Sequence, residues 1–181
     1  TEALRALADV QVDVHCFGGT RTDGSYGYDT PAEFADGNPA LQAIATDLAI
    51  ANNLGDVDVV HSHTWYANMA GHTAKLLYGT PHIVSAHSLE PLRPWKAEQL
   101  GGGYQISSWA EKTAYEGADA IIAVSDGMRA DVLKAYPNVD PAKVVTIRNG
   151  VDTNKFAPNS DSSVLTEYGI TGRYAMFVGR I

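Results

Sequence analysis

Two patterns of apolar and polar positions alternate along the chain. Short apolar runs, typical of buried strands, each precede a longer stretch whose apolar positions recur three or four residues apart, as on one face of a helix. Strands that alternate with helices in this way predict a parallel sheet joined by right-handed crossovers. The expected strands cover residues 10–17, 57–62, 82–86, 120–124 and 143–147, and the expected helices cover 2–9, 39–54, 65–78, 104–116 and 127–136.

We therefore expect an α/β fold, a Rossmann-like parallel sheet with helices on both faces. Local signals support the boundaries: Asn38-Pro39 supplies a cap and a first-turn proline for one helix, and Gly79 ends the next. The pattern opens inside a helix, and its last apolar run, residues 174–178, has the character of a strand with no helix after it. The sequence thus predicts a fold that is incomplete at both ends.

Three parts are expected along the chain. Residues 1–150 should form a Rossmann-like domain that lacks its first strand, with the polar, glycine-rich stretch 18–37 as a loop. Residues 151–172, which include Pro158 and a Ser-Asp-Ser run, are expected to be a linker with one short helix. Residues 173–181 should hold the first strand of a second domain.

The net charge limits the classes of molecule that the protein is expected to bind. The 181 residues include 13 Lys and Arg against 21 Asp and Glu, and this net charge of -8 opposes binding to nucleic acid and to anionic membranes. The single cysteine, Cys16, cannot form an internal disulfide, which fits a reducing compartment. No apolar stretch reaches the roughly 20 residues needed to cross a bilayer. We expect a soluble, cytoplasmic protein with a small or neutral partner.

Polar and aromatic side chains gather where the expected strands end. Ligands of such sheets bind beyond the carboxyl ends of the strands, because loops and helix N-termini converge there. His61 and His63 share one face of a strand, and His87 could lie one strand away. A three-histidine metal site is one interpretation. Because no HExxH spacing accompanies these residues, we favour hydrogen-bonded histidines at a strand end and expect no metal.

The segment after residue 87 is dense in charge. Arg93 and Lys96 flank Trp95, which could stack on a sugar ring while the two cations hold hydroxyls or a phosphate. A solvated surface loop is the competing interpretation. Tyr66, near a strand end, is a second candidate for ligand contact, whereas Trp109 is expected in the core. The chain contains no GxSxG elbow and no GxGxxG or GxxxxGK[ST] phosphate loop.

Three strings in these regions carry a resemblance to a known family. They are VVHSHTWYANMAGHTAKLLYGTPHIVSAHSLEPLRPWKAEQLGGGYQISSWAEKTA, DAIIAVSDGMRADVL and VVTIRNGVDTNKFAP, and the chain ends in FVGRI. They resemble retaining GT-B glycosyltransferases of family four, and most of all the actinobacterial glycogen and maltose-1-phosphate synthases. SAHSLEPLRPWK is specific to that subgroup, whereas NGVD and FVGR occur across the wider family. The resemblance implies that residues 1–150 are the acceptor-side domain and that Asn149 and Gly150 begin the hinge.

The resemblance also implies roles for single residues. His87 would be the catalytic histidine that contacts the donor sugar, and Arg180 of FVGR would neutralise the donor diphosphate. Thr64 and Ser88 align with positions that contact the acceptor. Together with the candidates from charge and aromatic character, the expected acceptor-binding residues are Thr64, Tyr66, Ser88, Arg93, Trp95 and Lys96.

The implied reaction moves glucose from ADP-glucose to an α-1,4-glucan end or to glucose 1-phosphate, with retention and without a cofactor or metal. A homodimer is compatible with the resemblance. The family's N-terminal glycine-rich loop, a lysine after the FVGR arginine and the acidic pair of the second domain are absent from these residues, so the chain alone is expected to be inactive. The alternatives are a non-catalytic Rossmann-like ligand-binding module, or a UDP- or GDP-sugar transferase with a lipid or small-molecule acceptor.

Overall fold

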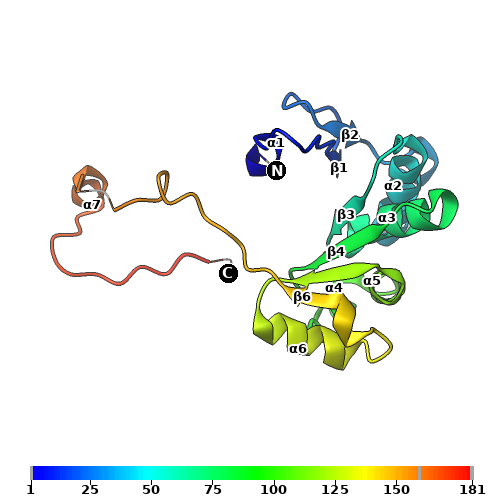
Figure 1. Cartoon of the computed structure of the whole chain (residues 1–181). Helices are drawn as coiled ribbons and strands as arrows, with labels where there is room; N and C mark the ends of the chain where they lie inside the picture. The colour runs from blue at the N-terminus through cyan, green and yellow to red at the C-terminus, as the bar shows by residue number, and fades with distance from the viewer. Residues whose placement is uncertain (1, 159, 180–181) are drawn as a thin grey trace. The chain divides into compact units, whose positions relative to one another are not determined.

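The computed structural model describes residues 2–158 and 160–179, which fall into two compact units, Thr1–Arg148 and Asn149–Ile181. In the second unit the described residues form one short helix, α7 (Ser163–Glu167). The first unit carries the fold (Figure 1). Its elements, in chain order, are α1 (Glu2–Arg5), β1 (His15–Phe17), β2 (Tyr26–Tyr28), η1 (Ala32–Phe34), α2 (Pro39–Asn53), β3 (Val60–His63), α3 (Trp65–Tyr78), β4 (His82–Ala86), η2 (Glu90–Leu92), α4 (Lys96–Leu100), α5 (Gly103–Gly117), β5 (Ala120–Ala123), α6 (Asp126–Ala135), η3 (Pro141–Lys143) and β6 (Val144–Thr146).

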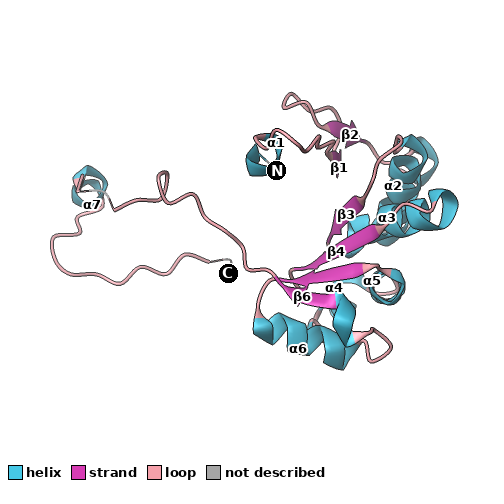
Figure 2. Cartoon of the chain, viewed as in Figure 1, coloured by secondary structure: helices cyan, strands magenta, loops and turns pink. Residues whose placement is uncertain are grey.

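A four-stranded parallel sheet organises this unit, with the strands in the order β3-β4-β5-β6 (Figure 2). Consecutive strands are added in one direction, so right-handed crossovers place α3, α5 and α6 on the same face. A separate parallel pair, β1-β2, precedes the sheet in the chain. The predicted α/β, Rossmann-like fold class is confirmed.

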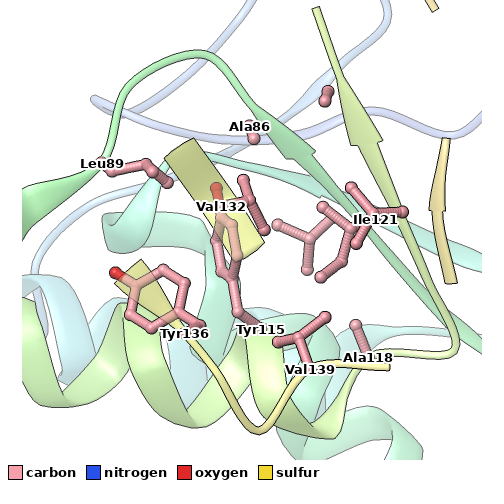
Figure 3. Close-up of a cluster of buried hydrophobic side chains, with 11 residues drawn as sticks. Ala86, Leu89, Tyr115, Ala118, Ile121, Val132, Tyr136 and Val139 are labelled. Atoms are coloured by element: carbon pink, nitrogen blue, oxygen red, sulfur yellow. The ribbon is translucent and has the colours of Figure 1, made fainter. Parts of the chain in front are cut away.

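The main core lies between this sheet and its helices. Val84 and Ile121 are fully buried on the helix-covered face, where they meet Tyr115 of α5 and Tyr136, the residue after α6 (Figure 3). Full burial of one such side chain contributes about 1.5 to 3 kcal/mol. The intervening residues point to the other face and are less buried, as Val145 with 49% exposure shows. The described helices therefore cover one face more fully than the other.

Helix α3 approaches β4 closely at Gly71. A Cβ atom on Gly71 would lie 2.3 Å from His82 Nε2, so only glycine leaves room for the buried imidazole. His82 Nε2 is in turn 2.8 Å from Ser62 Oγ, which donates to Asn68 Oδ1 of α3 at 2.9 Å. Burial lowers the pKa of His82 to about 4, so its ring is neutral at pH 7. These contacts fix the first half of α3 against β3 and against the start of β4.

Some expected elements differ in the structure, and each difference has a physical cause. Residues 10–14 are not a strand, because among the described residues only 15–17 find a partner, which is β2. The segment Tyr26–Tyr28 lies in the expected loop and becomes a strand only through this pairing. Residues 174–179 form no strand, and no strand lies in the described part of their unit to pair with them.

A buried carboxyl group on α2 makes stability depend on pH. Asp47 is fully buried, and burial raises its pKa to about 8, with backbone N–H groups of Met69 and Ala70 offsetting only part of this effect. A carboxyl group whose pKa is higher in the folded than in the unfolded state destabilises the fold progressively as pH rises between the two values. The penalty is therefore absent below about pH 4 and complete above about pH 8.

Asp47→Asn should accordingly raise the melting temperature of the protein by several degrees at pH 9, and by nothing near pH 4. Thermal unfolding at intervals between these pH values measures the difference. Asp56→Asn, at an exposed position, is the matched control and should show no such trend. Equal melting temperatures for Asp47→Asn and the unaltered protein at pH 9 would contradict this account of Asp47.

Candidate functional site

The predicted site residues converge at the carboxyl ends of β3 and β4. These strands pair in parallel with His63 opposite Ser85, so the residues that follow them emerge at one edge of the sheet. His63 ends β3 and Thr64 follows it, and His87 and Ser88 follow β4. The sheet thus brings together side chains that are 24 residues apart in the sequence.

Three histidines form a row on the less covered face of the sheet. The rings of His61 and His63 lie with centroids 4.4 Å apart, which confirms that they share a face, and the rings of His63 and His87 stack at 5.2 Å. His63 Nδ1 and His87 Nε2 lie 2.9 Å apart in a direct hydrogen bond, and His61 Nε2 pairs with Ser85 Oγ at 2.8 Å. Within the described part of the chain, no group of three histidine, cysteine or acidic residues is arranged to hold a metal ion.

This row keeps His63 neutral. Burial has the largest effect on the pKa of His63 and the neighbouring His61 and His87 add to it, so that together they lower this pKa to about 4. A neutral His63 can donate to or accept from His87 Nε2, depending on the tautomer. In the described chain His87 Nδ1 has no hydrogen-bond partner, so this nitrogen is the one left to meet a ligand.

Thr64, a predicted acceptor contact, holds a strained backbone conformation at the N-terminus of α3. Its φ of 66° and ψ of 158° make it the one described non-glycine residue with positive φ. For a β-branched residue this conformation costs on the order of 1 to 3 kcal/mol, and such strain tends to occur at functional sites. Its hydroxyl donates to His63 O rather than capping the helix, so backbone N–H groups at the start of α3 remain available at this edge.

Aromatic side chains flank the histidine row. Tyr66 is 45% exposed and makes edge contacts with Phe17 and Trp65, with ring centroids 5.6 and 5.9 Å apart. Phe17 was not predicted as a site residue, although it ends the expected strand 10–17 and the strand-end rule could have indicated it. A cavity of about 960 Å³ between segments 9–17 and 57–63 reaches His63 and Tyr66.

Arg93 and Lys96, the two residues of the charged loop after β4 that were predicted to bind a phosphate, make different contacts in the structure. Arg93 Nη1 lies 3.5 Å from Ser88 Oγ, so its guanidinium group is beside the residue that follows His87. Lys96 instead donates to Glu90 Oε1 at 2.7 Å, and its side chain is only 14% exposed. Trp95, between them, is 55% exposed and available for contact. The structure therefore brings Arg93 into the site and pairs Lys96 with a buried carboxylate.

Trp109 does not lie in the core, contrary to the prediction. It is 53% exposed, because the buried positions of α5 include Ser107, Ala110, Glu111, Ala114 and Tyr115, and Trp109 lies on the opposite face of the helix.

The remaining predicted residues belong to the second unit. Asn149 and Gly150 begin it, two residues beyond the hydrogen bond by which Ile147 joins β5. Their role as a hinge stays a prediction. Arg180, the predicted ligand of the donor diphosphate, lies outside the described residues.

The lowered pKa predicts that His63 stays neutral in the range where a free histidine titrates. In the full-length protein, the NMR signal of ¹³C-labelled His63, assigned with His63→Asn, should not shift between pH 8 and about pH 5. His87→Ala removes one neighbouring imidazole and should raise the His63 pKa toward its ordinary 6.5. A midpoint near 6.5 in the unaltered protein would show that the stack does not form.

The chain is similar to known proteins over most of its length. Among the residues that the structure describes, no helix is long and apolar enough to cross a membrane. The chain is 55% identical over 183 aligned positions to the "Alpha-maltose-1-phosphate synthase" of Mycolicibacterium smegmatis, covering 98% of the chain and 46% of the relative. The protein of that name from Mycobacterium tuberculosis strain H37Rv is 51% identical, covering 94% and 45%.

A more distant relative, the "D-inositol 3-phosphate glycosyltransferase" of Mycobacteroides abscessus, is 29% identical over 85% of the chain and 34% of its own length. The chain spans less than half the length of these curated relatives. The sequence pattern of Glycosyltransferase Family 4 matches residues 1–155. The chain therefore belongs to glycosyltransferase family 4.

Proposed function

We propose that this chain is the acceptor-side part of a retaining glucosyltransferase. The whole enzyme would move glucose from ADP-glucose to glucose 1-phosphate or to the end of an α-1,4-glucan. The observation that carries the proposal is the placement of the Arg93 guanidinium group beside Ser88, the residue that follows His87 at the carboxyl end of β4. The two relatives that are identical at about half of the aligned positions are both named for a phosphorylated disaccharide, which fits a cation at the acceptor position.

The geometry supports a role for each residue in this reaction. His87 would contact a hydroxyl of the transferred sugar through Nδ1, while His63 holds Nε2. Arg93 presents a planar array of donors suited to two phosphate oxygens at once. Tyr66 and Trp95 offer exposed aromatic faces to a sugar ring. Thr64 and Ser88 would add hydroxyl contacts to the acceptor.

A second candidate is transfer from a UDP- or GDP-sugar to a phosphorylated small molecule. The relatives named for D-inositol 3-phosphate favour it, although their identity is only about 30%. Arg93 would bind the phosphate in either reaction. Incubation of the full-length enzyme with ADP-, UDP- and GDP-glucose and each acceptor distinguishes the two, and we expect product from ADP-glucose with glucose 1-phosphate or glucan. A non-catalytic ligand-binding module would form no product with any pair.

His87→Ala should lower the turnover of the full-length enzyme by about a hundredfold, the usual effect of losing a positioned catalytic group. Steady-state kinetics with saturating donor measure it, and unchanged thermal unfolding shows that the variant is folded. His72→Ala is the control, because His72 lies on α3 against Gly117, away from the strand ends. Near-normal turnover of His87→Ala would overturn the assignment.

Arg93→Met should raise the KM for glucose 1-phosphate roughly tenfold to a hundredfold, the loss expected for a hydrogen bond to a charged group. Glucan extension should change little, because that acceptor carries no phosphate. Lys112→Met removes a charge from an exposed position on α5 and should alter neither activity. Equal losses on both acceptors would mean that Arg93 supports the fold rather than the phosphate.

A further inference from the structure

Glu90, at the start of η2, is tied to its surroundings through both oxygens of its side chain. Oε1 accepts from Lys96 Nζ at 2.7 Å, and Oε2 accepts from Ser107 Oγ of α5 at 2.8 Å. The residue is only 1% exposed. A carboxylate in such a position needs partners for its charge, and these two contacts supply them.

The backbone of Glu90 is held as well. Its N–H donates to Glu111 Oε1 of α5 at 2.7 Å, and its carbonyl accepts from Tyr104 OH at 3.0 Å. Glu111 also accepts a hydrogen bond from the buried hydroxyl group of Tyr136. The polar groups of Glu90 therefore join the loop after β4 to α5 and, through Glu111, to the end of α6.

Burying the charged groups of this network costs hydration free energy. Burial raises the pKa of Glu111 to about 7, which shows how strongly the site disfavours a second carboxylate. A buried ion pair often adds no net stability over apolar residues of the same volume, because both charges lose their hydration. What a fully satisfied polar network supplies is a single conformation, since no other arrangement pairs all its groups.

The conformation that it selects determines where Arg93 lies. Arg93 N donates to Glu90 O at 3.0 Å, and Lys96 N donates to Arg93 O at 2.9 Å, so the arginine backbone is held from both sides by the two members of the ion pair. Its guanidinium group then reaches Ser88. Lys96 influences the site through this geometry, with its own ammonium group turned to Glu90.

We infer that Glu90 and Lys96 are positioning residues that set the affinity for the acceptor's phosphate by fixing the loop that carries Arg93. The inference rests on the proposed function for the identity of the acceptor. The effect of the Glu90–Lys96 ion pair on the conformation of the loop does not depend on the proposed function, and this effect can be measured without substrate.

The test uses the full-length enzyme and compares Lys96→Met, Arg93→Met and the double variant. Lys96→Met should raise the KM for glucose 1-phosphate about tenfold to a hundredfold, as expected when a binding group is misplaced by about 1 Å. If Lys96 acts through Arg93, adding Lys96→Met to Arg93→Met should raise the KM no further. Multiplied effects would mean that Lys96 binds the phosphate itself, and would overturn the inference.

Hydrogen–deuterium exchange of peptides covering residues 88–100 gives the readout that needs no substrate. Exchange there should be faster in Lys96→Met, with little change elsewhere, because the loop loses one of its anchors. Unchanged exchange would overturn the inference even if the enzyme proved not to use glucose 1-phosphate. In that case the absence of product from the unaltered enzyme would separately reject the proposed function.

Two further variants serve as controls. Lys96→Met leaves the Glu90 carboxylate buried without its cation, which could prevent folding. Glu90→Gln/Lys96→Met removes both charges and avoids this problem. Its loop should also exchange faster than that of the unaltered enzyme. Lys75→Met breaks the ion pair with Asp119, which has the same 2.7 Å separation but joins α3 to the residue before β5. It should change neither the exchange of residues 88–100 nor the KM, and an equal effect would remove the distinction on which the inference depends.

Discussion

The parallel pairing of β3 with β4 is the constraint on which the rest of the site depends. In this register Ser62 faces α3 and meets His82 and Asn68, while His61 and His63 face the opposite side. A slip of one residue would exchange these faces, which would bury the imidazole of His63 and expose the polar contact beneath α3. The same hydrogen bonds that align the strands therefore decide which histidines can reach a ligand.

Polar groups on this unit divide into two sets with different tasks. The buried set, centred on Glu90 and Glu111, satisfies its own hydrogen bonds within the fold. The exposed set, which includes His87 and Trp95, is carried on the backbone that the first set holds in place. Rigid support behind exposed groups is what lets a binding site discriminate between ligands, because the binding energy is not consumed in ordering the loop.

Much of the fold was predictable because local signals and tertiary contacts agree. The bounds of α3 and β4 match the predictions of 65–78 and 82–86, where clear periodicity is combined with Gly79 as a helix end. The convergence of His63 and His87 followed from the strand-end rule. The pairing of Lys96 with Glu90 could not be predicted, because it depends on how the segment after β4 folds onto α5. Likewise β2 has no periodicity of its own and exists only through its partner.

The cavity beside the histidine row is lined by segments that contain the edges of β1 and β3 left unpaired among the described residues. In the described chain β1 pairs only with β2, and β3 pairs only with β4, so each strand keeps one row of N–H and C=O groups unmatched. Exposed rows of this kind invite pairing between molecules. Residues 2–148 produced alone would therefore be prone to self-association, starting from the edge of β3.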